Sequence, residues 1–285
     1  MNSIWITGAG GQLGRELCRR LKRRRRLFAT DLELDICDRA AVEGFMAEHD
    51  IDTIVNCAAY TNVEAAEDER ELCYKVNEQG TRVLALAAKK ADAALIQIST
   101  DFVFDGSRRS PYRESNSPAP LNVYGQSKLA GEEAIQQSGC KGIILRTAWL
   151  YSPYGKNFMK TMVALGQNRS RIGVVCDQIG SPTAADSLAD TIARIIPRAG
   201  DFRGKIYHFS GRGECSWNDF ATEIMRLAGC NCKVDKISSD EYPQKATRPK
   251  YSYLDCSRIK QEFGIEAEPW QSALERNMRR LRILR

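Results

Sequence analysis

The sequence predicts an α/β protein, with a Rossmann-like doubly wound parallel sheet and a smaller, mostly C-terminal lobe. Short apolar runs alternate with amphipathic helical stretches through the first half of the chain, as in a parallel sheet covered by helices. A glycine-rich turn separates the first apolar run from the first helical stretch. After about residue 150 the elements become shorter and loops intervene, which indicates the second part.

Five buried strands are predicted in order, each a run of apolar and β-branched residues bounded by turn residues. They are SIWITGAG (3–10), LFATD (27–31), DTIVNCAA (52–59), ALIQIST (94–100) and GIILRTAWLY (142–151). Helical periodicity follows the first four, in GQLGRELCRRLKRR (11–24), AAVEGFMAEH (40–49), residues 67–90 and SKLAGEEAIQQS (127–138). Later helices are expected at 186–197, at 217–229 and near the C-terminus.

The composition is that of a globular protein, with 43% apolar and 27% charged residues. No run approaches 18 apolar residues, and the N-terminus lacks a basic segment with a cleavage site, so we expect a cytoplasmic protein without membrane contact. The ten cysteines include no CxxC pair and are accompanied by only two histidines. We therefore expect reduced thiols and no zinc site.

Two basic runs, residues 22–26 and 276–285, concentrate much of the positive charge behind the net value of +6. A nucleic-acid surface would interleave such residues with aromatic side chains, which neither run does. Cations are favoured at the C-terminal end of a helix, where the first run is expected to lie. No nucleic-acid partner is therefore expected, and the modest basicity suits anionic nucleotide ligands.

Gly8, Gly11 and Gly14 form a GxxGxxG pattern between the first strand and the first helix. Glycine permits the tight turn and lets the backbone approach a pyrophosphate, whose charge the helix N-terminus favours. Asp31 closes the second strand, where a carboxylate binds the adenosine ribose hydroxyls and disfavours a 2′-phosphate. The pattern predicts NADPH or NADH as cofactor, and Asp31 favours NADH; an aspartate that only caps a turn is the alternative.

A second group of residues predicts reduction of a carbonyl. Thr100 ends the fourth strand, and Tyr124 and Lys128 follow at a spacing that places them on one face of a helix. Ketone reduction needs a proton for the oxygen, and an adjacent ammonium lowers the pKa of a phenol toward neutrality. We expect Tyr124 as the acid, Lys128 as its partner and as a ligand of the cofactor ribose, and Thr100 as a hydrogen-bond partner of the substrate oxygen.

With these residues in place, the chain resembles the extended short-chain dehydrogenases/reductases, and among them the dTDP-4-dehydrorhamnose reductase family. The similarity covers nearly the whole length, through TGAGGQLGREL, ELDICD, VNCAAYTNVEAAE, YKVNEQGT, STDFVFDG, PLNVYGQSKLAGEEA, LRTAWLYS, NFMKTM, DQIGSPT, SWNDFA and RPKYSYLD. The resemblance implies NAD(P)H-dependent reduction of the 4-keto group of a nucleotide-activated 6-deoxyhexose, dTDP-4-dehydro-L-rhamnose to dTDP-L-rhamnose. STDFVFDG, LNVYGQSKLAGE and DQIGSPT are its most specific motifs.

The resemblance also implies roles for individual residues. The catalytic trio would be Thr100, Tyr124 and Lys128. Besides Gly8 and Asp31, cofactor contacts are implied for Gly11, Gln12, Leu13, Asp35, Ile36, Ala59, Tyr60 and Thr61, together with Tyr124 and Lys128. The sugar nucleotide would meet Thr100, Asp101 and Trp149, with the Arg248 guanidinium as a candidate for the diphosphate. The alternatives are that Trp149 is only a core residue and that Arg248 is only a surface residue.

These roles predict two parts of the chain. Residues 1–148 would form the NAD(P)-binding Rossmann domain, rejoined by about 186–210. Residues 149–185 and 211–285 would form the substrate-binding lobe, because selection among sugar nucleotides has to lie outside the shared cofactor site.

A metal ion is a further implication of the resemblance, because certain members of the family hold magnesium with glutamates at a dimer interface. Glu16 matches one of these positions, but Asp186 and Gln271 stand at the others. The loss of a carboxylate argues against a metal here. The homodimer that such a site would accompany is left open.

Two rival functions remain. Another extended short-chain enzyme acting on a nucleotide sugar would share the motifs, including a reductase that gives the 4-epimer, 6-deoxy-talose. A dehydratase is disfavoured, because such enzymes carry Asp-Glu after the active-site Thr, whereas Asp101 and Phe102 follow Thr100 here. The second rival is a non-catalytic regulatory subunit similar to the methionine adenosyltransferase β subunit. The sequence leaves open the nucleotide, the C4 epimer and the choice between NADH and NADPH.

Overall fold

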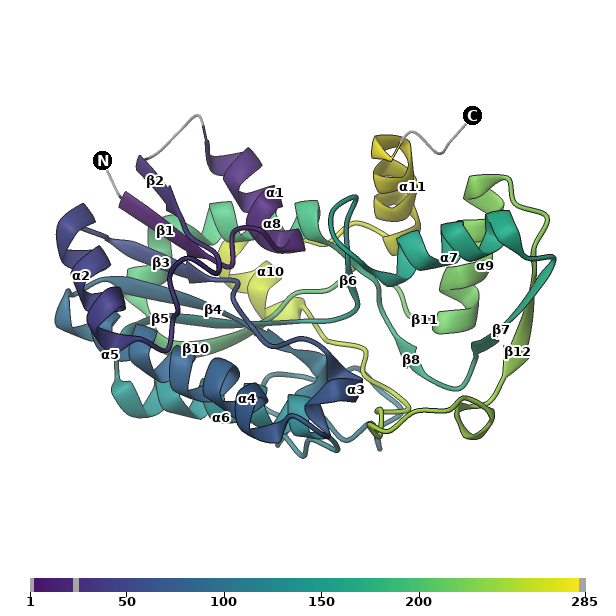
Figure 1. Cartoon of the computed structure of the whole chain (residues 1–285), viewed down its shortest axis with the longest axis horizontal. Coiled ribbons are helices and arrows are strands. Elements are labelled where there is room, and N and C mark those ends of the chain that lie inside the picture. The colour runs from purple at the N-terminus through teal and green to yellow at the C-terminus, as the bar shows by residue number, and fades with distance from the viewer. Residues whose placement is uncertain (1–2, 23–25, 282–285) are drawn as a thin grey trace.

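A computed structural model of the chain describes residues 3–22 and 26–281 (Figure 1). Within these residues, six parallel strands form one sheet in the order β2-β1-β3-β4-β5-β10. Their bounds are β1 Ser3–Thr7, β2 Arg26–Ala29, β3 Thr53–Asn56, β4 Ala94–Thr100, β5 Lys141–Thr147 and β10 Arg203–His208. The strand order reverses at β1, and such a switch point opens a ligand crevice at the carboxyl ends of the strands. The predicted α/β, doubly wound fold class is confirmed.

Helices cover both faces of this sheet, as Figure 1 shows. One face carries α1 (Gln12–Leu21), α8 (Ala185–Ile195) and α10 (Ser257–Phe263). The other face carries α2 (Arg39–His49), α5 (Thr81–Lys90) and α6 (Val123–Ser138). Each helix buries an apolar stripe against the sheet, so the strands are apolar on both faces and read as continuous apolar runs in the sequence.

The lobe lies beside the sheet and has an apolar core of its own. Its helices are α7 (Phe158–Asn168), α9 (Trp217–Ala228) and α11 (Trp270–Arg280). Short strands pair as β6 with β9, β7 with β12, and β8 with β11; the bounds are Leu150–Tyr151, Thr183–Ala184, Arg171–Val175, Lys233–Ile237, Ile179–Gly180 and Cys215–Ser216. Between the lobe segments the chain returns to the sheet through α8 and β10.

The helix expected over residues 67–90 is interrupted. The chain forms α3 (Val63–Ala66), α4 (Arg70–Tyr74), a π-helical turn η1 (Lys75–Gly80) and then α5. A π-turn adds one residue to a helical turn, which the spacing of apolar residues does not reveal. Such turns are frequent at functional sites, and this one holds the buried Asn77 beside the predicted site.

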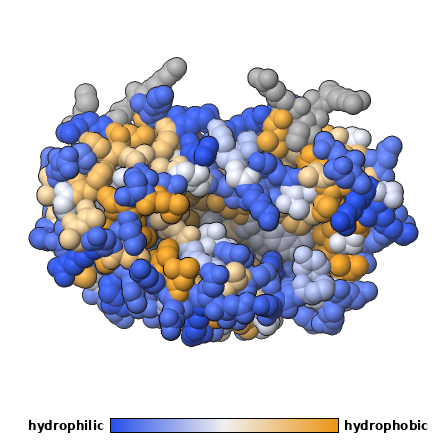
Figure 2. Space-filling model, viewed as in Figure 1, coloured by the Kyte–Doolittle hydropathy of each residue, from blue (hydrophilic) through white to orange (hydrophobic). Residues whose placement is uncertain are grey.

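The surface view in Figure 2 shows a hollow between the sheet half and the lobe, with mainly hydrophilic residues around it. Among residues 3–22 and 26–281, no helix has both the length and the apolar character needed to cross a membrane. All ten cysteines are free thiols. Residues 23–25 and 282–285, which belong to the two basic runs, lie outside the described residues.

Candidate active site

The glycine-rich turn lies at the carboxyl end of β1. Gly8 has a φ of +62°, and a Cβ there would lie 2.6 Å from the backbone nitrogen of Ala58, so only glycine fits. α1 begins at Gln12 with Gly11 as N-cap, and among the described residues no side chain caps its N–H groups. Unpaired donors at a positive helix end suit a pyrophosphate. The turn therefore fits the predicted dinucleotide.

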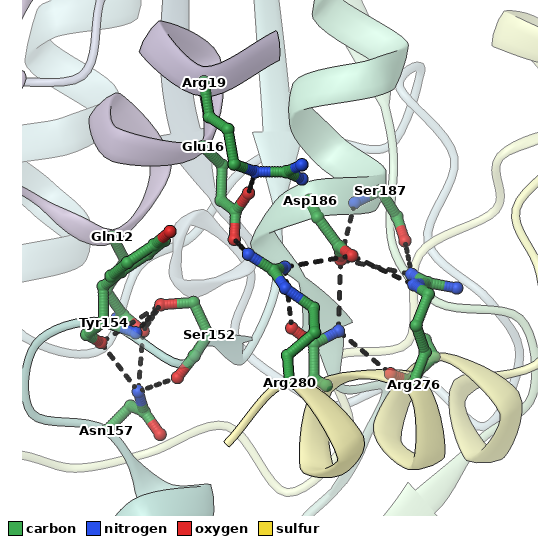
Figure 3. Close-up of polar contacts among 12 residues, drawn as sticks. Gln12, Glu16, Arg19, Ser152, Tyr154, Asn157, Asp186, Ser187, Arg276 and Arg280 are labelled. Atoms are coloured by element: carbon green, nitrogen blue, oxygen red, sulfur yellow. Dashed lines mark hydrogen bonds and ion pairs between the residues drawn. The ribbon is translucent and has the colours of Figure 1, made fainter. Parts of the chain in front are cut away.

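Gln12, the first residue of α1, is held by a loop of the lobe. Its side-chain Oε1 accepts hydrogen bonds from Ser152 Oγ at 3.0 Å and from Asn157 Nδ2 at 2.9 Å (Figure 3). Leu13 buries its side chain in the core below α1, which leaves its backbone N–H for a ligand. Segments 140 residues apart thus fix the start of α1 together.

Asp31 follows β2 and is exposed at the edge of this turn. A Cβ on Gly10 would lie 2.2 Å from Asp31 Oδ2, so the carboxylate lies directly against the glycine turn. The Asp31 backbone N–H donates to Glu33 Oε1 at 2.8 Å, which brings a second carboxylate to the same place. The expected ribose end of the cofactor site is therefore negatively charged.

Asp35 and Ile36 lie in the loop after β2. Asp35 Oδ1 accepts a hydrogen bond from the backbone N–H of Cys37 at 2.9 Å. The Ile36 side chain is buried in the sheet core and lies against Gly80 of the π-turn. If Ile36 contacts a cofactor, it does so through its backbone N–H or carbonyl group.

Residues 59–61 follow β3, next to the glycine turn, and the π-turn holds them through Asn77. Asn77 Oδ1 accepts from the backbone N–H of Tyr60 at 2.9 Å, and its Nδ2 donates to the Tyr60 carbonyl at 3.0 Å. The same Nδ2 donates to Ser127 Oγ of α6 at 2.9 Å. Asn77 is not among the residues predicted from the sequence; its signal would have been a polar residue at a buried helical position.

Thr100 ends β4, Asp101 begins the 3-10 turn that follows, and both are buried. Thr100 Oγ1 donates to Asp101 Oδ1 at 3.1 Å and accepts a hydrogen bond from the backbone N–H of Phe102. Burial raises the pKa of Asp101 to about 6, against the opposing effect of hydrogen bonds from Ser252 and Thr100. The carboxyl group beside the predicted substrate oxygen therefore takes up a proton more readily than an exposed aspartate.

Tyr124 lies in the first turn of α6, whose N-cap Asn122 accepts a hydrogen bond from the backbone N–H of Gly125. Its ring meets the Phe102 ring edge to face, with the centroids 5.8 Å apart. Burial raises the pKa of Tyr124, and a hydrogen bond with Thr100 offsets this only in part. The structure therefore brings Tyr124 and Thr100 together, with the phenol protonated at neutral pH.

Lys128 lies one turn further along α6, and its ammonium donates to the Ile98 carbonyl at 2.6 Å. Burial lowers the pKa of Lys128 to about 8, while the charge of Glu132 works to raise it. From the sequence, this ammonium is expected to lower the pKa of Tyr124. That expectation is wrong for this structure, because burial dominates at the phenol and the ammonium is bound to Ile98.

A buried ion pair lies behind Lys128. Arg146 of β5 donates to Glu132 through Nε at 2.8 Å and through Nη2 at 2.6 Å, and both side chains are at most 2% exposed. Ser99 Oγ donates to the same carboxylate at 2.5 Å. Glu132 stands in the quoted SKLAGEEA motif, but its pairing with Arg146, 14 residues further along on the next strand, leaves no local pattern in the sequence.

Trp149 lies where the chain leaves the sheet, with a φ of +46°, a backbone conformation that is uncommon outside glycine. Its ring stacks on Trp217 of α9 with the centroids 3.6 Å apart. A Cβ on Gly180 would lie 2.7 Å from the Trp149 ring, so the ring is packed from that side as well. The two tryptophans form an aromatic pair at the junction of sheet and lobe.

Arg248 lies in the loop that precedes Tyr251, the residue that forms a β-bridge with Ile179 of β8. Its side chain is bound to Glu64 of α3. Its Nη2 donates to Glu64 Oε1 at 2.7 Å, and Glu64 also accepts the backbone N–H of Lys245 at 2.7 Å. Asn122, the N-cap of α6, donates to the Thr247 carbonyl at 2.8 Å. The Arg248 loop is thereby attached to the helix that carries Tyr124.

The residues matching the family's magnesium ligands do not fit that ion. Among residues 3–22 and 26–281, no group of three or more His, Cys, Asp or Glu side chains is placed to hold a metal. Gln271 is exposed on α11, whereas Glu16 and Asp186 are both paired with the guanidinium of Arg280. A cavity of about 330 Å³ lies elsewhere, and none of the predicted site residues lines it.

Comparison with known proteins places this geometry in a family. A family model described as the RmlD substrate binding domain matches residues 1–283. Curated proteins named dTDP-4-dehydrorhamnose reductase are similar over nearly the full length. The one from Aggregatibacter actinomycetemcomitans is 41% identical, over 96% of this chain and 98% of its own. The chain belongs to the dTDP-4-dehydrorhamnose reductase family.

Solved structures agree with this membership. The reductase of this family from Clostridium acetobutylicum superposes with a TM-score of 0.95 at 39% identity, covering 98% of this chain and 99% of its own. The one from Bacillus anthracis, solved in complex with NADP, has a TM-score of 0.94 at 40% identity and covers 98% and 100%. The predicted family, fold and class of NAD(P)H-dependent oxidoreductase are therefore confirmed.

Proposed function

We propose that this chain reduces the 4-keto group of a nucleotide-activated 6-deoxyhexose, dTDP-4-dehydro-L-rhamnose, to dTDP-L-rhamnose, with NADPH or NADH as reductant. The observation that carries the proposal is the placement of Thr100, at the end of β4, and Tyr124, in the first turn of α6, together at the carboxyl edge of the sheet that also carries the glycine turn. The names of the relatives supply the sugar nucleotide.

When bound, NADPH or NADH would supply the hydride that the C4 carbonyl carbon accepts. Tyr124 donates a proton to the carbonyl oxygen, and its raised pKa keeps that proton on the phenol until the oxygen becomes basic. The Thr100 hydroxyl, which donates to Asp101 here, would turn its proton to the same oxygen and stabilise the charge that develops there. Lys128, with a pKa of about 8, gives up a proton easily and so can reprotonate Tyr124.

Substrate contacts complete the proposal. The Trp149–Trp217 pair offers an apolar surface for one face of the sugar, and Asp101 offers an oxygen acceptor near the reacting carbon. Arg248 would bind the diphosphate with its guanidinium once Glu64 shares or releases it. We assign cofactor binding to residues 1–148, rejoined by about 186–210, and sugar-nucleotide selection to residues 149–185 and 211–285.

A dehydratase is disfavoured by the same geometry. An elimination needs an additional acid and base near the sugar, and the residue after Asp101 is Phe102, whose ring packs on Tyr124. The phenyl group places an apolar surface where a carboxylate would be required.

A direct assay tests the function. Purified protein is incubated with dTDP-4-dehydro-L-rhamnose and NADPH or NADH, oxidation of the cofactor is followed by absorbance, and the product is identified by NMR. The L-rhamno product supports the proposal, whereas the 6-deoxy-talose epimer would reassign the face of hydride attack. Cofactor binding without turnover would instead favour a regulatory subunit.

The charge at Asp31 predicts the choice of cofactor. We expect NADH to be used at least as well as NADPH, because two carboxylates lie where a 2′-phosphate would bind. Asp31→Ala should raise the NADPH-to-NADH ratio of kcat/KM by about tenfold, since ~1.4 kcal/mol of repulsion corresponds to that factor. The prediction is contradicted if kcat/KM of the wild type with NADPH exceeds that with NADH by more than about tenfold.

Arg248 predicts a separable effect on the substrate. We expect Arg248→Ala to raise the substrate KM by about 10–100-fold, because a charge-assisted hydrogen bond contributes ~1.5–3 kcal/mol, and to leave the cofactor Kd unchanged. Lys245→Ala is the matched control, since Lys245 lies on the same loop but pairs with the exposed Asp68. Paired titrations of cofactor and substrate decide the matter. Equal weakening of both ligands, or of neither, would show that Arg248 serves only the fold.

A further inference from the structure

Three helices from distant parts of the chain meet beside the glycine turn through charged side chains (Figure 3). Glu16 of α1 is fully buried, and Asp186 stands in the first turn of α8. Arg276 and Arg280 come from α11, the last helix of the described chain. A buried carboxylate such as Glu16 needs a positive partner, so the question is which cation supplies it.

Arg280 and Arg19 both supply it, one at each oxygen of Glu16. The Arg280 Nη2 lies 2.6 Å from Glu16 Oε1, and its Nη1 lies 3.3 Å from Asp186 Oδ2, so one guanidinium bridges the two carboxylates. Arg19 donates to the other oxygen of Glu16 at 2.9 Å. Arg276 donates to Asp186 through Nε at 3.0 Å. The two carboxylates therefore accept contacts from guanidinium groups on both sides.

The charges in this cluster balance. The described carboxylates are Glu16, Asp186 and Glu268, and the described guanidinium groups that contact them are Arg19, Arg276 and Arg280. Burial works to raise the pKa of Asp186, but hydrogen bonds from Arg276 and Asn277 prevail and lower it, so the carboxylate stays charged. No uncompensated negative charge remains among these residues to attract a divalent cation.

We propose that Arg280 is a built-in cation that replaces a divalent metal between Glu16 and Asp186 and fastens α11 to the cofactor-binding helix α1. An arginine suits this task because its planar fork can contact two carboxylates at once. The cation is a side chain of the same polypeptide, so these ion pairs require neither a bound ion nor a partner subunit.

The guanidinium of Arg280 is also connected to Gln12 indirectly, through Tyr154 and the residues that bind it. The Arg280 guanidinium lies over the Tyr154 ring, 5.9 Å from its centroid, and Arg15 of α1 lies over the same ring at 5.8 Å. The Tyr154 carbonyl accepts hydrogen bonds from Ser152 Oγ and Asn157 Nδ2, which are also the groups that hold the Gln12 side chain. Arg280 is thus a positioning residue for the first turn of α1.

The test compares Arg280→Ala, Arg280→Lys and Arg279→Ala with the wild type, each in EDTA and in millimolar Mg²⁺. Arg279→Ala is the matched control, because Arg279 is 68% exposed on the same helix and pairs only with Glu275 among the described residues. Thermal unfolding gives the Tm, and elemental analysis gives the metal content of the purified protein. Neither readout depends on the proposed function; the Kd for NADH or NADPH, which does, is measured alongside.

We expect the wild type to have the same Tm in EDTA and in Mg²⁺ and to purify without stoichiometric metal. Arg280→Ala should lower the Tm by roughly 5–10 °C in EDTA, because the fully buried Glu16 loses the cation at Oε1, which Arg19 on Oε2 does not replace, and Asp186 loses one of its two cations. Mg²⁺ should restore part of that loss, since carboxylate oxygens are its preferred ligands. Arg280→Lys should fall between, Arg279→Ala should match the wild type, and the dinucleotide Kd should rise only for Arg280→Ala and Arg280→Lys.

Several outcomes would overturn the proposal. A wild-type Tm that falls in EDTA, or stoichiometric bound metal, would show that a true ion occupies the cluster. An Arg280→Ala variant as stable as Arg279→Ala would show that the bridge contributes nothing. If Mg²⁺ leaves the Tm of Arg280→Ala unchanged, the carboxylates are no cation site and Arg280 replaces none.

Discussion

Tyr124→Phe is expected to lower kcat by about 10²–10⁴-fold, the usual contribution of a positioned general acid. The substitution removes the proton donor but keeps the ring, which packs edge to face on Phe102. Since the proton is needed only as the hydride arrives, the loss should appear in kcat more than in substrate KM. Steady-state kinetics with the purified variant measure both.

The control lies in the same apolar cluster. Tyr74 packs against the cluster of Ala66, Cys73 and Val123 that also contacts Tyr124, and its hydroxyl reaches only Gln126 and Arg70 among the described residues. Tyr74→Phe should therefore leave kcat within about twofold of the wild type, as for surface changes worth ±0.5 kcal/mol. A Tyr124→Phe variant as active as Tyr74→Phe would remove Tyr124 from its assigned role.

The features that the sequence predicts correctly depend on neighbouring residues. A buried strand followed by glycines and a helix identifies the cofactor edge, and the structure places Gly8 and α1 there. The helix at 217–229 is recognisable because Ser216 and Asp219 form a capping box and Gly229 ends it with a φ of +62°. The spacing of Tyr124 and Lys128 on one helix needed no tertiary information.

What the sequence could not predict depends on contacts between distant segments. The attachment of Arg248 to Glu64 joins residues 184 positions apart, and the stacking of Trp149 on Trp217 joins sheet and lobe. The pKa of Tyr124 was expected to be lowered, and the burial that raises it is likewise a property of the folded site. The predicted sugar and diphosphate contacts of Trp149 and Arg248 accordingly stay predictions.

Glu132→Ala is expected to produce the largest loss of stability, about 3–5 kcal/mol in the free energy of unfolding, because it leaves Arg146 charged and unpaired in the interior. Both side chains are at most 2% exposed, so water cannot replace the lost partner. The Ser99 hydroxyl also loses its acceptor. Chemical denaturation of the variant measures the change, provided that the slope of the transition is unaltered.

A double variant separates the pair's own contribution from the cost of an orphaned charge. Glu132→Leu with Arg146→Met removes both charges and keeps apolar volume, so it should be less destabilised than Glu132→Ala, since well-packed apolar residues replace buried ion pairs at little cost. The double variant should nevertheless lose activity, because the charge of Glu132 works to raise the pKa of Lys128. Without it, the Lys128 ammonium should lose its proton below pH 8, and the alkaline limb of the kcat profile should move to lower pH. If the double variant is no more stable than Glu132→Ala, the ion pair itself stabilises the packing of α6 on β5. The loss in Glu132→Ala would then not be due only to an unpaired charge on Arg146.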